Sequence, residues 1–201
     1  MKTYKIHLIR HGMTDANIDG RYIGCKTDLP LSPEGVRELK SLRENLEYPD
    51  IEALYTSPLL RCKQTASVIY PGFEPISVDE LTEYDFGVFE NKTARELEIM
   101  PEYLEWTSGK ISATPDGEDT NDFIKRIALG INMIVRDMME KDITNAGVIM
   151  HGGAIMMFLA TCAVPRKRSV EWTSDNGRGY SIMITPSLYH SSGIVEVYDI
   201  I

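Results

Sequence analysis

The segment of residues 4–17 constrains the fold of this chain more than any other. Residues 6–9 form a short apolar run, which indicates a β-strand buried on both faces and stopped by a glycine and a polar cluster. Arg10 and His11 therefore stand at the carboxyl end of that strand. Because ligands of open α/β sheets bind at this edge, a guanidinium beside an imidazole is suited to holding a phosphate next to a nucleophile or a proton carrier.

Short apolar runs and amphipathic segments alternate along the rest of the chain. Further strands are expected at residues 51–56, 75–78, 146–150, 180–185 and 194–198, the last two as a hairpin-like pair at the sheet edge. Helices are expected at residues 33–46, capped by Ser32, and at 57–70, 93–99, 101–106, 120–138 and 154–164. This alternation predicts a three-layer α/β fold, in which helices cover both faces of a mostly parallel sheet.

The length of the chain sets its domain organisation. With 201 residues and no repeat, low-complexity tract or linker, we expect a single domain over residues 1–201. Residues 15–30 are expected to form a polar loop near the strand end. Residues from about 79 to 145 are expected to carry an insert that covers the site, and its part at 86–119 would decide which substrate is accepted.

The composition excludes several classes of function. The net charge of −9 makes a nucleic-acid role through general basic attraction unlikely and favours a small anionic ligand held by a local cationic cluster. The three cysteines have no metal-ligand spacing, which is typical of a reducing compartment. The first strand begins too early for a signal peptide, and no apolar run reaches the roughly 18 residues of a membrane span. We therefore expect a cytoplasmic protein without a membrane partner.

Each of the first four predicted strands is followed by a residue that can take part in catalysis. These residues are His11, Arg61, Glu83 and His151. Taken singly, each is more often structural or solvated than catalytic. Parallel strands would bring all four to one edge of the sheet, however, and structure alone rarely requires such a set. The conjunction predicts an active site.

The motifs in which these residues stand resemble those of a known family. They are Leu-Ile-Arg-His-Gly at 8–12 with Thr14 and Asn17, Ser-Pro-Leu-Leu-Arg-Cys-Lys-Gln-Thr-Ala at 57–66, the segment 81–90, and His-Gly-Gly at 151–153. In this order they resemble the histidine phosphatase superfamily, which includes the cofactor-dependent phosphoglycerate mutases. The resemblance covers residue 6 to about residue 160.

The resemblance implies a phosphohistidine mechanism. His11 would attack phosphorus as a neutral imidazole whose other nitrogen keeps its proton, through a backbone carbonyl. Glu83 would protonate the leaving oxygen and then activate water, which needs a raised pKa. The expected phosphate-binding residues are Arg10, Asn17, Arg61 and His151, whose donors suit the charge on the phosphoryl oxygens. No metal and no cofactor is expected, because the cationic side chains take that part.

Two of the three departures from the family pattern favour hydrolysis over phosphoryl return. The third, Met13 where the family often has glutamate, is not expected to abolish the chemistry, because Thr14 and Asn17 remain. In mutases the residues after the catalytic glutamate are typically basic, but here they are Tyr84 and Asp85. The segment between the glutamate and the second histidine is also short compared with mutases. The loop at 21–32 resembles the α-ribazole phosphatase branch. The candidate substrate contacts are Thr14, Arg21, Gly24 and Tyr84.

The sequence therefore predicts a phosphomonoester hydrolase that acts on a small phosphorylated metabolite, as a monomer or a homodimer. Two alternatives stay open: a cofactor-dependent phosphoglycerate mutase, and a catalytically silent protein that binds phosphorylated ligands. His7 is expected within the first strand and His190 in an exposed turn, neither with a role. The aromatic residues Tyr84, Phe86, Phe89, Tyr103 and Trp106 could line a slot for a ring, although packing is the favoured interpretation for most of them.

Overall fold

A computed structural model describes residues 2–46 and 48–201. Its strands are β1 (Tyr4–Arg10), β2 (Ala53–Thr56), β3 (Ile76–Ser77), β4 (Asn145–Met150), β5 (Ala163–Val164), β6 (Gly179–Ile184) and β7 (Val195–Ile200). They form one seven-stranded sheet in the order β3-β2-β4-β1-β6-β7-β5. The strands β1 to β4 run parallel to one another, and β6 is antiparallel to both of its neighbours. The predicted mixed, mostly parallel α/β sheet is confirmed.

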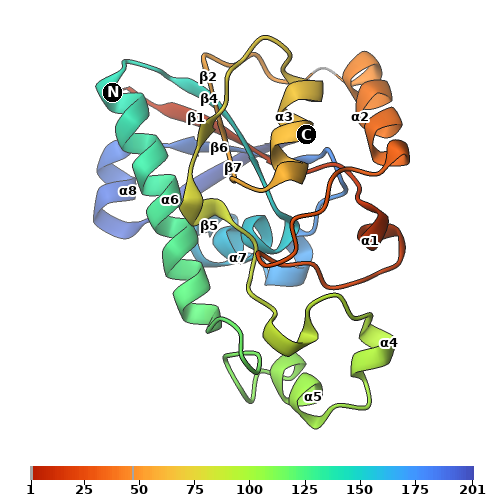
Figure 1. Cartoon of the computed structure of the whole chain (residues 1–201). Helices are drawn as coiled ribbons and strands as arrows, with labels where there is room; N and C mark the ends of the chain where they lie inside the picture. The colour runs from red at the N-terminus through yellow and green to blue at the C-terminus, as the bar shows by residue number, and fades with distance from the viewer. Residues whose placement is uncertain (1, 47) are drawn as a thin grey trace.

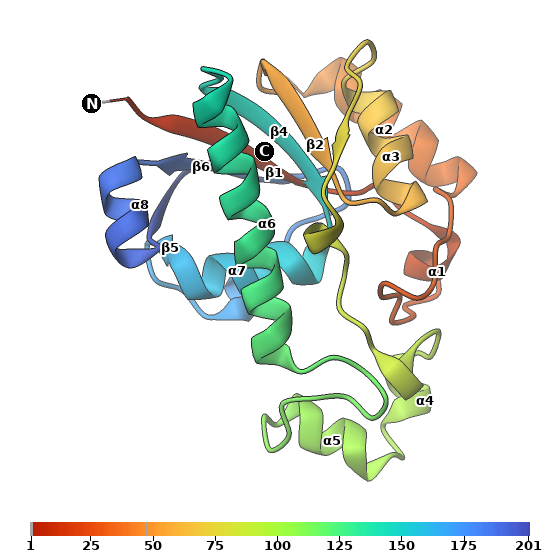
Figure 2. The same cartoon turned by 60° about the vertical axis from the view of Figure 1, so that its left-hand side comes forward.

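The helices cover both faces of this sheet. They are α1 (Asp15–Ile18), α2 (Pro33–Asn45), α3 (Leu60–Ile69), α4 (Ala94–Leu97), α5 (Pro101–Thr107), α6 (Thr120–Glu140), α7 (Gly152–Cys162) and α8 (Pro186–Ser192). Helices α2 and α3 pack on one face, and α6 and α7 pack on the other (Figure 1). Figure 2 shows α4 and α5 projecting beyond the sheet, at the bottom of the view.

The alternation of side chains along β1 explains why both faces need cover. Ile6 and Leu8 are buried in the core under α6 and α7, whereas Ile9 is buried in the core under α2 and α3. Successive side chains of a strand point to opposite faces, so an apolar run of this kind is stable only between two layers of helices. The central strand β1 is thus held between the two layers of helices, and its carboxyl end presents Arg10 and His11 at the edge of the sheet.

Two helix starts follow the sequence signals closely. The side chain of Ser32 accepts a hydrogen bond from the backbone of Gly35 and precedes Pro33 at the start of α2. The side chain of Asp119 caps α6 by accepting from Asn121 N at 2.7 Å. These caps fix where each helix leaves the loop before it, and therefore where those loops lie relative to the carboxyl edge of the sheet.

Several local predictions need correction. Residues 15–30 include the short helix α1, and α3 begins at Leu60 with no side-chain cap rather than at Ser57. The last two strands pair antiparallel but do not form the sheet edge, because β5 lies outside β7 and is too short to give an apolar pattern. His190 lies in α8, whose start at Pro186 makes that connection a helix rather than a turn. His7 lies in β1 as expected.

No helix within residues 2–46 and 48–201 is long and apolar enough to cross a lipid bilayer.

Candidate active site

A cavity of about 850 Å³ opens at the edge of the sheet where β1 ends and α7 begins. Six of the ten candidate catalytic, phosphate-binding and substrate-contact residues line it: Arg10, His11, Asn17, Arg21, Glu83 and Tyr84. Arg61 and His151 lie behind this wall, fully enclosed but in direct proximity to His11. The structure thus brings together the four residues that follow the first four strands.

His11 stands at the end of β1 and is only 5% exposed. Its Nδ1 lies 2.7 Å from the carbonyl oxygen of Gly12. Because a carbonyl only accepts hydrogen bonds, Nδ1 carries the ring proton and Nε2 keeps a free lone pair. Burial, with a further contribution from the Arg61 charge, lowers the pKa of His11 to about 3. The imidazole is therefore neutral throughout the physiological pH range.

His151 stands at the end of β4 and caps the start of α7. Its ring centroid lies 5.2 Å from that of His11, with the planes inclined at 65°. Its Nε2 lies 2.8 Å from Ser57 Oγ, which places the ring between the two strand ends. Burial lowers the pKa of His151 well below its usual value, and the nearby Arg61 charge acts in the same direction. Both imidazoles are consequently neutral donors or acceptors rather than cations.

Two guanidinium groups, that of Arg61 buried and that of Arg10 partly buried, adjoin the imidazole of His11. Arg10 donates from NH1 to the Ser174 carbonyl at 2.7 Å. Arg61 donates to the carbonyls of Thr27 at 3.0 Å and Gly24 at 3.1 Å. Within the described part of the chain, the buried Nε–H groups of Arg10 and Arg61 find no acceptor. A buried unpaired donor needs an explanation, and an anion held between two such donors supplies one.

Glu83 lies in the segment after β3 and is 7% exposed. Its Oε1 accepts a hydrogen bond from Tyr84 N at 2.9 Å, and its Oε2 accepts from Gly153 N at 3.0 Å. Burial raises the pKa of Glu83 above the usual carboxyl value, although both hydrogen bonds and the charges of Arg61 and Arg10 oppose that change. A carboxyl group with a raised pKa can hold a proton at a pH where free glutamate has lost it.

Thr14 and Asn17 form the capping box of α1. Thr14 accepts from Asn17 N, and Asn17 Oδ1 accepts from Thr14 N at 3.1 Å and from its hydroxyl at 3.0 Å. This arrangement holds the oxygen end of the Asn17 amide, so that Nδ2 remains outside the capping box, and Asn17 is one of the residues that line the cavity. Thr14 is fully buried and does not line the cavity; its contact is with Asn17.

The three remaining candidate substrate contacts differ in position. Arg21 lines the cavity but already donates to Asn91 O at 2.8 Å and pairs with two carboxylates of the same rim. Gly24 does not line it; a Cβ there would meet Tyr84 O at 2.0 Å, so the residue permits a close backbone approach. Tyr84 lines the cavity, and its hydroxyl donates to Glu118 O.

Aromatic and thioether side chains form much of the remaining wall. Tyr22, Phe86, Trp106, Met156 and Met157 line the cavity together with the ring of Tyr84. The other two predicted aromatics, Phe89 and Tyr103, instead pack in a small core with Leu97. Three of the five predicted aromatics therefore line the cavity, together with Tyr22, while Tyr22, Phe86 and Trp106 also pack against that small core; a ring-binding slot stays a prediction.

Sequence reasoning missed the residues that hold the central groups in place. Asn176 donates from Nδ2 to the His11 carbonyl at 2.8 Å, and Ser174 supplies the carbonyl that Arg10 contacts. Both lie just before β6, which runs antiparallel to β1 and so begins at the carboxyl edge. Ser57 stood within a recognised motif but received no role. Within the described residues, no group of three or more His, Cys, Asp or Glu side chains could hold a metal ion.

Comparison with known proteins agrees with this geometry. The adenosylcobalamin/α-ribazole phosphatase of Escherichia coli (strain K12) is 30% identical over 161 residues, which cover 78% of this chain and 77% of that protein. The crystal structure of the α-ribazole phosphatase from Shigella flexneri superposes with a TM-score of 0.75 at 23% identity, covering 96% of this chain and 94% of that chain. The phosphoglycerate mutase from Bacillus anthracis str. Sterne gives a TM-score of 0.79 at 21% identity, covering 98% and 92%.

The structural likenesses show a shared fold, and a family model carries the assignment further. The model of the histidine phosphatase superfamily (branch 1) matches residues 6–187. The match therefore includes all four strand ends that meet at the cavity. The chain belongs to branch 1 of the histidine phosphatase superfamily and is a phosphomonoesterase of that superfamily.

Proposed function

We propose that this phosphatase hydrolyses the phosphomonoester of a small metabolite through a phosphohistidine formed on His11. One observation carries the proposal: a neutral, buried imidazole with a free Nε2 adjoins the guanidinium groups of Arg10 and Arg61, whose buried Nε–H donors have no acceptor within residues 2–46 and 48–201. A nucleophile that must not be protonated and a site that must attract an anion are thus present together.

The first step forms a bond between His11 Nε2 and phosphorus and breaks the bond between phosphorus and the ester oxygen. Glu83 gives its proton to that oxygen as it leaves. The transition state spreads negative charge over three equatorial oxygens, which Arg10, Arg61 and His151 would surround, with the amide of Asn17 as a further donor.

In the second step Glu83, now a carboxylate, accepts a proton from water as the water oxygen attacks phosphorus. The bond between phosphorus and Nε2 breaks, and inorganic phosphate leaves. Glu83 thus alternates between acid and base, and its raised pKa favours the protonated form that the first step needs.

The walls of the cavity support hydrolysis of an ester with an apolar leaving group. A mutase must hold the carboxylate of phosphoglycerate, but here Asp85 follows Tyr84 and pairs with Lys26 at 2.9 Å. Of the cavity-lining cations, Arg21 already pairs with Asp19 and Glu96. Because the relatives include proteins named α-ribazole phosphatases, α-ribazole phosphate is the first metabolite to test. The insert around residues 79–145 would act as the cover that selects the leaving group.

The deciding experiment measures release of p-nitrophenolate and phosphate from p-nitrophenyl phosphate by the wild-type chain and by His11→Ala. We expect turnover with the wild type and none above background with the variant, whose fold circular dichroism should find unchanged. Undiminished turnover in His11→Ala would remove the assigned nucleophile, and no turnover by the wild type would favour a silent binder. Rapid formation of 2-phosphoglycerate from 3-phosphoglycerate and 2,3-bisphosphoglycerate, with little free phosphate, would instead indicate a mutase. A cytoplasmic location and a monomer or homodimer remain predictions.

A further inference from the structure

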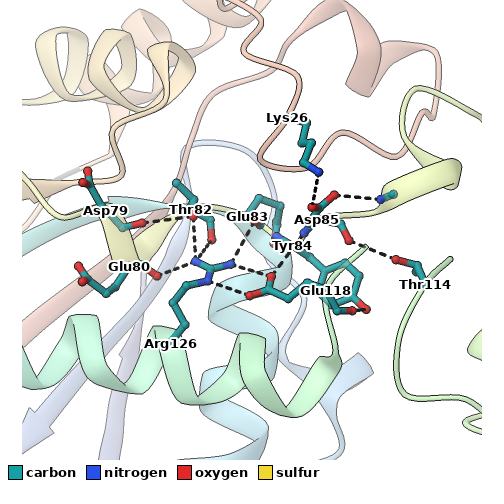
Figure 3. Close-up of polar contacts among 11 residues, drawn as sticks. Lys26, Asp79, Glu80, Thr82, Glu83, Tyr84, Asp85, Thr114, Glu118 and Arg126 are labelled. Carbon is teal, nitrogen blue, oxygen red and sulfur yellow. Dashed lines mark hydrogen bonds and ion pairs between the residues drawn. The ribbon is translucent and has the colours of Figure 1, made fainter. Parts of the chain in front are cut away.

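Arg126 reaches from the second turn of α6 to the segment that carries Glu83 (Figure 3). Its NH1 donates to Glu80 O at 2.8 Å, to Thr82 O at 2.9 Å and to Thr82 Oγ1 at 2.8 Å. Its NH2 lies 3.4 Å from Glu83 O. One side chain therefore contacts three backbone carbonyls within four consecutive residues.

Glu118 holds this guanidinium in place. Nε of Arg126 donates to Glu118 Oε1 at 2.9 Å, and NH2 donates to Oε2 at 2.8 Å, which makes a bidentate pair. Both side chains are shielded from water, at 24% and 18% exposure. A guanidinium has five N–H donors, and the carboxylate and the backbone acceptors together engage its whole fork. A lysine could not reproduce this arrangement, because it has no planar fork.

The segment from Thr82 to Phe86 lies between two short 3₁₀ helices and belongs to no helix or strand; the 3₁₀ hydrogen bonds that reach it join its two ends, from Thr82 N to Asp79 O and from Phe89 N to Phe86 O. Buried carbonyls need donors, and Arg126 supplies those for Glu80, Thr82 and Glu83. The Glu83 carboxyl is held at its other end by backbone N–H groups of Tyr84 and Gly153. The position of this carboxyl group in the cavity therefore depends on where Arg126 holds the backbone of Thr82 and Glu83.

The same pair also joins this segment to the cover of the cavity. Glu118 N donates to Asp85 O at 3.0 Å, and the Tyr84 hydroxyl donates to Glu118 O. Asp85 in turn pairs with Lys26, from the loop after α1, as Figure 3 shows. Arg126 in α6 and Glu118 in the loop before α6 thus both contact the segment that carries Glu83.

We propose that Arg126, oriented by Glu118, is a positioning residue that sets the Glu83 carboxyl against the leaving-group oxygen. This inference rests on the proposed role of Glu83 as general acid. Arg126 does not line the cavity; it acts through the backbone of Thr82 and Glu83. Its loss should therefore affect proton delivery more than phosphate binding.

The test compares two esters in three variants. Arg126→Gln and Arg126→Lys should lower kcat/KM for a simple alkyl phosphate about 10- to 100-fold, because a misplacement of about 1 Å can cost that much. They should lower kcat/KM for p-nitrophenyl phosphate less than about threefold, because p-nitrophenolate leaves without a proton. The comparison uses kcat/KM because it reports the first step, whereas kcat also includes the second step, in which Glu83 is the base for both esters. Arg136→Gln is the matched control: it removes an exposed arginine of the same helix, paired only weakly with Glu140 at 3.7 Å, and should leave both rates unchanged.

Equal losses of kcat/KM on the two esters in Arg126→Lys would overturn the proposal, since they would indicate a general structural role. Full activity of Arg126→Lys on both esters would also overturn it, because it would show that the positive charge alone is sufficient. If Arg126→Gln does not fold, Glu118→Gln serves for the same comparison, because it weakens the bidentate pair that orients the guanidinium and keeps Arg126 itself. The same selective loss is expected there, and a loss shared by both esters would count against the pair. Failure of the wild type to hydrolyse either ester would refute the proposed function itself, which is a distinct outcome.

Discussion

Gly153, the second residue of α7, offers a direct test of how tightly the Glu83 carboxyl is placed. A Cβ at this position would lie 2.7 Å from Glu83 Oε1 and 3.0 Å from Oε2. The backbone of Gly153 is helical and not left-handed, so alanine is compatible with its conformation and even favours the helix, by up to about 1 kcal/mol. Gly153→Ala should therefore fold normally while pushing the carboxyl away.

The size of the displacement sets the size of the effect. An ordinary contact begins at 3.4 Å, so the carboxyl must retreat by about 0.7 Å, that is 3.4 minus 2.7 Å. The hydrogen bond from Gly153 N to Oε2 must lengthen or turn at the same time. Misplacement on the scale of 1 Å costs about 10²-fold, and general acid catalysis as a whole contributes about 10²- to 10⁴-fold. We expect kcat/KM for an alkyl phosphate to fall between 10- and 100-fold, about 1.4–2.7 kcal/mol of activation free energy.

The assay measures kcat/KM for an alkyl phosphate and for p-nitrophenyl phosphate in Gly153→Ala and in its neighbour Gly152→Ala, because kcat/KM reports the step in which the leaving group departs. A Cβ at Gly152 would instead meet Arg10 Nε at 3.1 Å, so Gly152→Ala should lower kcat/KM for both esters modestly and to the same extent. In Gly153→Ala the nitrophenyl ester should lose less than about threefold, and the thermal midpoint should stay within a few degrees of wild type. A loss of equal size on both esters in Gly153→Ala would refute the placement of Glu83 as the proton donor.

Three further predictions follow from the buried groups. The ratio of kcat/KM for the alkyl ester to that for the nitrophenyl ester should fall as pH rises through the raised pKa of Glu83, because only its protonated form can donate; pH profiles from 4 to 9 measure this, and a ratio independent of pH contradicts it. Ser57→Ala removes the hydrogen bond to His151 Nε2 and should lower kcat/KM about tenfold on both esters, consistent with about 0.5–1.5 kcal/mol; a loss confined to one ester would be inconsistent with phosphate binding. Phe158→Ala, at a side chain 1% exposed, should lower the free energy of unfolding by about 3–5 kcal/mol in urea titrations, and a change below 1 kcal/mol would show that α7 is not packed as described.

Much of the fold was predictable because its signals are local. Residues 6–9 and 146–150 have the apolar patterns of buried strands, and parallel strands share a carboxyl edge. The meeting of His11 with His151 follows from that rule alone, although 140 residues separate them in the sequence. The helix at Pro186 also carried a local signal, proline at a helix start, which outweighs a turn once the C-cap at Gly193 is considered.

The residues that escaped prediction act through partners with no sequence pattern. Asn176 meets His11 only because β6 runs antiparallel to β1, and strand direction depends on pairing rather than on local composition. Arg126 looked like one more polar residue on an amphipathic helix. Its acceptors are backbone carbonyls, which every residue possesses, so the pattern of side chains could not point to the segment it contacts.

A single physical cause links the unusual properties of the site. Burial at the sheet edge lowers the pKa of His11 and His151 and raises that of Glu83, so each of these groups tends to its uncharged form. Guanidinium groups resist this tendency because they stay charged across the physiological range. Positive charge at the site therefore resides on the arginines, which attract the phosphoryl group and also keep the imidazole beside them unprotonated. Binding of the anion and availability of the unprotonated nucleophile are thus consequences of the same arrangement. In a more exposed site, water would screen the arginine charges, and this would weaken both effects.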